Sequence, residues 1–171
     1  MSPLVSISGL RKTMTYRLYL IILFWFFGLL SALLVLKLTP YSLMYPLFIE
    51  RVSIVGMIVS LTFPFIFSYI LLNRGYFYLV LPIILLKAFG YMFCFCCYSK
   101  IFGTSGWLVR SVLLFSDSIA VFLLLYYCYR YATGNRKGSF QYFRFSILAL
   151  ILSGCLDYYI VSPFIMMLIN Y

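Results

Sequence analysis

Long apolar runs, separated by short polar stretches, make up most of this chain. Five of the runs are long enough to form membrane-spanning helices, because about 20 residues at a rise of 1.5 Å per residue cross the roughly 30 Å of bilayer hydrocarbon. None alternates apolar and polar residues as a membrane β-strand of about 9 to 11 residues must. The predicted spans are residues 18–36, 52–72, 76–98, 107–129 and 146–168.

The composition also indicates a membrane protein. Of the 171 residues, 65% are hydrophobic and only 9% are charged, which is more apolar than a soluble domain of this size can bury in one core. We therefore predict an all-α, polytopic membrane helix bundle of about five transmembrane helices. The spans and their short loops leave no room for a soluble domain, so residues 1–171 are predicted to form a single integral membrane domain.

Basic residues outside the spans are unevenly divided between the two sides of the membrane. The 13 Lys and Arg are spread between hydrophobic segments rather than clustered on one polar face, which argues against nucleic acid as a partner. By the positive-inside rule, the side with more bases is cytoplasmic, so the N-terminus is predicted inside and the C-terminus outside. The inner bases are Arg11, Lys12, Arg17, Arg74, Arg130, Arg136, Lys137 and Arg144, and the outer ones are Lys37, Arg51 and Lys100.

Three charged residues, Lys87, Asp117 and Asp157, each fall near the midpoint of a predicted span. An unpaired Lys or Asp at the bilayer centre costs roughly 2.5 to 3.5 kcal/mol, so such groups are expected to face the bundle interior and pair. The third and fourth spans are predicted to form an antiparallel hairpin across residues 99–106, with Lys87 and Asp117 equally far from its middle. We therefore predict an ion pair between Lys87 and Asp117, with Asp157 as a second acceptor or a protonated acid.

Other polar and sulfur-containing residues near these charges have more ordinary interpretations. Arg110 precedes Asp117 by two helical turns on the same face and can snorkel toward the outer surface. Gly103 and Gly106 belong to the predicted turn. The five cysteines lie in or beside apolar spans and are interpreted as small packing residues. With no histidine and without the two Cys-x-x-Cys pairs of a zinc ribbon, the chain is predicted to hold no metal and no cofactor.

Three functions fit a bundle with two acids and one base at mid-depth. A proton or ion pathway needs ionisable groups on a wet route, and an intramembrane aspartyl protease needs two facing carboxylates, as Asp117 and Asp157 would supply. A scaffold would use paired charges to fix helix register. The protease is disfavoured because neither acid has Gly-x-Gly-Asp surroundings and Lys87 would neutralise one of them. A transporter needs a broken helix, for which Pro64 and Pro82 are weak candidates.

Small residues recur four positions apart in three spans, which lets helix backbones approach closely. We interpret this spacing as packing within one chain rather than as a dedicated oligomer interface, and leave a homo-oligomer as the alternative. The pairs are Gly28 with Ala32, Gly56 with Ser60, and Ala149 with Ser153.

The segment from Gly75 to Ala132 has a Lys in an apolar helix, then a glycine turn, then a helix with a polar interruption. These features are Leu81-Pro82, Leu86-Lys87-Ala88-Phe89-Gly90-Tyr91-Met92-Phe93, Phe102-Gly103-Thr104-Ser105-Gly106 and Ser116-Asp117-Ser118. In these features the segment resembles the stage II sporulation protein M family of small membrane proteins. Lys87 and Asp117 match two helix features of that family, whereas Ala88 and Met92 stand where the family tends to have glycine.

The resemblance implies a non-enzymatic subunit of the bacterial cytoplasmic membrane. It would assemble or localise peptidoglycan hydrolases, which carry out the catalysis themselves, during engulfment of the forespore. A more distant relative would instead serve another membrane complex, such as an ATP-driven transporter. Because the chain contains no catalytic signature, we predict a scaffold that is not an enzyme and that contacts the lipid bilayer and other membrane proteins.

Overall fold

The computed structural model describes residues 7–40, 53–102, 114–134, 139–161, 163 and 167. These residues form α-helices, one of which continues as a π-helical turn, and no strand occurs among them. The elements are α1 (Ile7–Leu38), α3 (Ile54–Asn73), α4 (Phe77–Phe102), α6 (Phe115–Ala132), α7 (Ser139–Leu156) and the π-helical turn η2 (Asp157–Val161). The predicted all-α bundle is confirmed.

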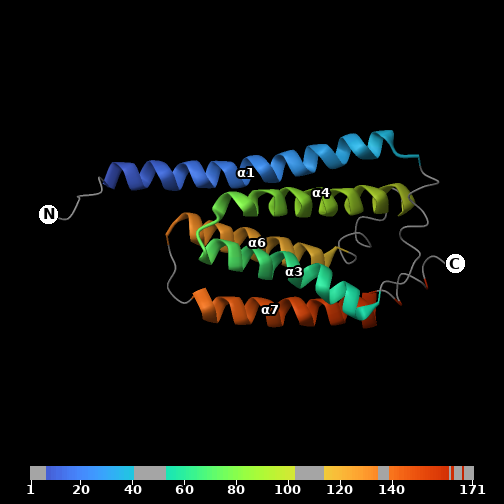
Figure 1. Ribbon diagram of the computed structural model, residues 1–171. Helices are drawn as coiled ribbons and strands as arrows, with labels where there is room; N and C mark the ends of the chain where they lie inside the picture. Colours follow the sequence, from blue (N-terminus) through green and yellow to red (C-terminus); the bar gives the residue numbers. More distant parts are fainter. Residues whose placement is uncertain are drawn as a thin grey trace.

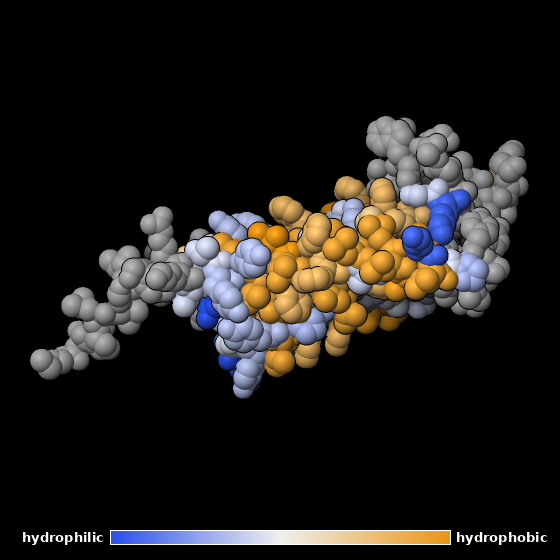
Figure 2. All heavy atoms as spheres, turned by 90° about the horizontal axis from the view of Figure 1, so that it is seen from above, coloured by the Kyte–Doolittle hydropathy of each residue, from blue (hydrophilic) through white to orange (hydrophobic). Residues whose placement is uncertain are grey.

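Four of these helices are long and apolar enough to cross a membrane. They cover Thr13–Leu38, Ile54–Asn73, Phe77–Cys97 and Ser139–Val161, the last running through α7 into η2. Figure 2 shows the corresponding hydrophobic band between two ends at which hydrophilic residues gather. The chain is therefore a multi-pass membrane protein by the length and composition of its helices.

Several helices extend beyond the spans predicted for them. α1 begins at Ile7 rather than at residue 18, and α7 begins at Ser139 rather than at residue 146. α4 continues to Phe102, so residues 99–102 are helical although they were predicted to form part of the turn. Hydropathy locates the hydrocarbon-crossing part of a helix, whereas Arg, Lys, Gln and Tyr continue the helix into the membrane interface.

The predicted span at residues 107–129 differs most from the structure. Its first part, residues 107–113, lies outside the described residues, and the described helix α6 runs from Phe115 to Ala132. α6 is not one of the four apolar spans, because Asp117, Arg130 and its tyrosines make it more polar. Asp117 consequently lies in the first turn of α6 and not at the midpoint of a helix.

Consecutive helices run in opposite directions and pack around α6, so that α1 and α4 run in the same direction (Figure 1). α6 contacts α1, α3, α4 and α7, while α1 lies chiefly along α4. In Figure 1 the described chain begins and ends at opposite ends of the bundle, as an odd number of antiparallel helices requires. The central place of α6 explains its polarity, because its polar groups can find partners on the surrounding helices.

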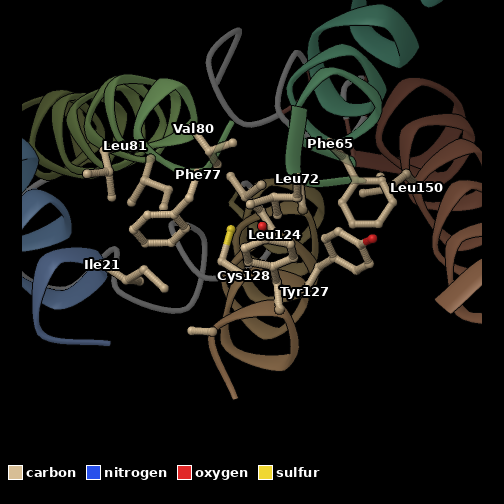
Figure 3. Packing of buried hydrophobic residues seen from close by; sticks show 14 of the residues in the cluster. Ile21, Phe65, Leu72, Phe77, Val80, Leu81, Leu124, Tyr127, Cys128 and Leu150 are labelled. Atoms are coloured by element: carbon tan, nitrogen blue, oxygen red, sulfur yellow. The ribbon is translucent and has the colours of Figure 1, made fainter. Parts of the chain in front are cut away.

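The core links all five of these α-helices. Figure 3 shows Leu124, Tyr127 and Cys128 of α6 between side chains of α4 on one side and of α3 and α7 on the other. Aromatic rings add to this packing: Tyr69 stacks on Phe143 with ring centroids 3.8 Å apart. Cys128 is fully buried in this cluster, in agreement with its interpretation as a packing residue.

Two tight turns lie at the same end of the bundle. After α3, Gly75 adopts a φ of 86°, and its N–H donates to the oxygen of Leu72 at 3.0 Å. After α6, Gly134 adopts a φ of 73°. Both values lie in the left-handed region that glycine enters at little cost, so these residues end their helices, and after Gly75 the chain reverses into α4.

The small residue Gly28 allows α1 to approach α4 closely. A Cβ atom at Gly28 would collide with the backbone oxygen of Leu85 and would lie 2.6 Å from the Cβ of Ala88. Ala32, the second member of this pair, is also buried. The pair Gly28 and Ala32 therefore packs within the chain, as predicted.

The other two small pairs differ from each other. Ser153 is buried beside Gly154, where an added Cβ would lie 3.2 Å from Ile58 of α3, so this part of α7 also packs within the chain. Ser60 of the remaining pair is exposed, and its hydroxyl donates to the oxygen of Met57 in its own helix. Intramolecular packing therefore does not account for Ser60.

Candidate functional site

An ion pair joins α4 to the central helix α6. The Nζ atom of Lys87, near the middle of α4, lies 3.4 Å from Oδ1 of Asp117. The side chain of Lys87 is 18% exposed and that of Asp117 is 38% exposed. Asp117 also lies in the first turn of α6, where the helix dipole favours a negative charge. The two charges that hairpin geometry places at equal depth are therefore in contact.

A neutral hydrogen bond joins the same two helices beside the ion pair. The hydroxyl oxygens of Tyr91 and Ser118 lie 3.2 Å apart. Ser118 already donates its only hydroxyl proton to the oxygen of Leu114 at 2.7 Å, so Tyr91 is the donor to Ser118. Tyr91 follows Lys87 by one helical turn, which places both contacts on one face of α4.

A third polar contact joins α6 to α7. Ser116, the residue before Asp117, is buried and donates from Oγ to the backbone oxygen of Ser153 at 2.9 Å. Asp157 lies one turn beyond Ser153 and starts the π-helical turn η2. Such turns occur frequently at functional sites.

Asp157 lies close to this contact but is less well satisfied. Its Oδ1 atom is buried and has no hydrogen-bond partner among the described residues. Ser116 and Asp117 both lie within interaction range of its carboxyl group. Lys87 forms its ion pair with Asp117 and not with Asp157 in the described part of the chain, so the interpretation of Asp157 as a second acceptor for Lys87 is wrong there. Protonation of Asp157 stays a prediction.

The helix that contains Asp157 begins earlier than the predicted span. It runs from Ser139 through η2 to Val161, and residues 163 and 167 are also helical. Its first seven residues are a mixture of polar and aromatic side chains that hydropathy does not count as apolar. Lys87 of α4 meets Asp117 in the first turn of α6, and Asp157 approaches the same helix from η2.

Three predicted site residues lie outside the described part of the chain: Arg110, Gly103 and Gly106. The five cysteines form no disulfide among the described residues, and Cys97 packs beside Leu36 of α1. Within the described ranges, no group of three or more His, Cys, Asp or Glu side chains is placed to hold a metal ion.

The hydrogen-bonding residues were not identified as site residues from the sequence. Ser116 and Ser118 flank Asp117, and Tyr91 lies one turn from Lys87, so their spacing was the available signal. Which neighbour each hydroxyl meets depends on the rotation of each helix about its axis. Only packing sets that rotation.

Comparison of the chain with protein-family models, with curated proteins and with solved structures gives no match. The membrane-spanning helices and the polar contacts at α6 are therefore the observations from which a function can be argued. We refer to Lys87, Tyr91, Ser116, Asp117, Ser118 and Asp157 as the polar cluster.

Proposed function

We propose that this chain is a non-enzymatic integral membrane scaffold on which other membrane proteins assemble. The observation that carries the proposal is the Lys87–Asp117 ion pair between α4 and α6. Tyr91 and Ser118 support it from the same two helices, and Ser116 connects α6 to α7. Polar groups at this level thus hold three helices in one register, which is a structural use of costly intramembrane charge.

The resemblance to the stage II sporulation protein M family suggests which partners the scaffold has. Lys87 and Asp117, onto which that resemblance maps, are the residues that form the ion pair. We propose that the chain lies in the bacterial cytoplasmic membrane and organises peptidoglycan hydrolases, which supply the catalysis. In this proposal the polar cluster sets the shape of the bundle and takes no part in a reaction.

A small transporter subunit is the second candidate function. It is favoured by Asp157, whose buried Oδ1 atom lacks a hydrogen bond within the described residues and whose carboxyl group interacts with a second acid, Asp117. Against it, α3 and α4 continue as helices through Pro64 and Pro82. Transporter sites are typically formed where a membrane helix is interrupted at mid-depth, and neither proline causes such an interruption. The scaffold is therefore the better-supported function.

The proposal is tested by isolating the tagged protein from its own host in a mild detergent and identifying the proteins that accompany it by quantitative mass spectrometry. We expect a peptidoglycan hydrolase in stoichiometric amount. The Lys87→Gln variant should recover less of it because the register of α4 and α6 is disturbed. The matched control Lys37→Gln removes an exposed charge at a helix end and should recover the normal amount. Recovery of an ATPase and a permease instead would support the transporter.

A further inference from the structure

Arginine side chains from several helices lie at one end of the bundle. This is the end at which α3 turns into α4 and at which α6 ends before α7 begins (Figure 1). We call these residues the arginine collar: Arg17 of α1, Arg74 of the turn after α3, Arg130 of α6 and Arg144 of α7.

Aromatic rings position three members of the collar. The guanidinium carbon of Arg17 lies 5.6 Å from the ring centroids of both Phe77 and Tyr131, which connects α1 to α4 and α6. Arg130 lies 5.6 Å from the ring centroid of Tyr142, and Arg144 lies 5.9 Å from that of Phe140 in the preceding turn of its helix. These are cation–π distances. A ring face does not use the N–H groups in the plane of a guanidinium, so such contacts are compatible with binding an anion.

The sequence segments that carry the collar contain no acidic residue. The whole chain contains three acidic residues, and none of them lies within residues 7–17, 69–77 or 126–144. The sequence adds further bases to the same segments, namely Arg11, Lys12, Arg136 and Lys137.

The collar lies where lipid headgroups would meet the bundle. Tyr126 and Tyr142, whose ring centroids are 5.1 Å apart, belong to an aromatic group at this end, as is typical of the membrane–water interface. Figure 2 shows the hydrophobic band giving way to hydrophilic residues at each end. Arg74 and Arg144 of the collar are exposed.

We propose that the arginine collar binds the headgroups of anionic phospholipids in the leaflet that it faces. A guanidinium donates two parallel N–H groups to the oxygens of a phosphate, and a net negative headgroup adds electrostatic attraction that a zwitterionic headgroup lacks. The proposal is independent of the scaffold function. In this proposal the collar does more than orient the protein in the membrane by its charge. It makes one end of the molecule selective for anionic lipid.

The test measures which lipid the purified protein retains. The protein in a neutral detergent is incubated with equal concentrations of phosphatidylglycerol and phosphatidylcholine, separated from unbound lipid by gel filtration, and its bound lipids are measured by mass spectrometry. We expect a preference for phosphatidylglycerol. The double variant Arg74→Gln, Arg144→Gln should lower it roughly 25-fold, at about fivefold for each base. Raising the salt from about 0.05 to about 0.5 M should also lower it.

The matched control removes two exposed bases from the opposite end, Lys37→Gln with Lys100→Gln, and should keep the preference. An equal loss in this control would mean that only net charge matters and would overturn the proposal, as would an unchanged preference in the arginine variant. Displacement of the lipid by the same concentration of inorganic phosphate would assign the collar to free phosphate instead. If the glutamine variant does not fold, Arg74→Lys with Arg144→Lys keeps both charges and should retain the preference over phosphatidylcholine.

Discussion

At the scale of single residues, the intramembrane charges are the most informative feature of the molecule. Lys87 is mostly buried and Asp117 is partly buried, and each would be costly in the bilayer without the other. The ion pair converts two charges into one neutral unit. The attraction within the pair contributes less to stability than the loss of one partner would cost, because the remaining charge would then be buried without a partner.

The first prediction concerns this pair. Lys87→Gln or Asp117→Asn alone should lower the free energy of unfolding by about 1 to 3 kcal/mol, less than for a fully buried pair because Asp117 is partly exposed. The double variant should lose clearly less than the sum of the two. The measurement is unfolding in mixed detergent micelles, followed by circular dichroism. Lys37→Gln, at an exposed position, should leave stability unchanged. Strictly additive effects would show that the two residues do not interact.

The sequence placed Lys87 and Asp117 in contact because depth in a hairpin can be counted from residue numbers. It did not place Tyr91 against Ser118, or Ser116 against Ser153, because these hydrogen bonds depend on how each helix is rotated. It placed Asp157 near Asp117 in depth, but the helix in which Asp157 lies begins earlier than hydropathy indicates.

At the scale of the helices, association depends on close approach of the backbones, because the hydrophobic effect does not drive helix association inside lipid. α1 and α4 show this most clearly, because Gly28 leaves no room for a side chain against Leu85 and Ala88. Gly90 lies inside α4, and no neighbouring atom lies within 4 Å of the position that a Cβ on this residue would take. The two glycines therefore form a natural comparison.

The second prediction uses that comparison. Gly28→Ala should lower the free energy of unfolding by about 1 to 3 kcal/mol, because the new methyl group forces α1 away from α4. Gly90→Ala should be neutral or stabilise by up to about 1 kcal/mol, because alanine is the better helix former and meets no neighbour. The same unfolding assay measures both. Equal effects of the two substitutions would mean that the contact at Gly28 does not limit the approach of α1 to α4.

At the scale of the whole molecule, the antiparallel order of the helices sets which loops share a side of the membrane. The turns after α3 and α6 lie at the end that carries the arginine collar, and Thr39, after α1, lies at the other end (Figure 1). The positive-inside rule then predicts that the collar faces the cytoplasm.

The third prediction is this orientation. In a variant without native cysteines, Thr133→Cys should react with a membrane-impermeant thiol reagent only from the cytoplasmic side, and Thr39→Cys only from the other side. Labelling in intact cells and in opened membranes separates the two cases. A variant that keeps Cys128 alone provides the control, because this buried thiol should react from neither side. Reaction of Thr39→Cys from the cytoplasm would reverse the orientation.

The sequence by itself determined the class of the molecule: helical, multi-pass, with paired charge inside it. Hydrophobic length and the cost of a buried charge are local properties that can be read from one chain. Only the tertiary structure decided that α6 is the central helix, that Asp117 lies in its first turn, and that arginines from different helices gather on aromatic rings at one end. These features depend on helix rotation and tilt, which arise from packing among all the helices and not from the residues of any one of them.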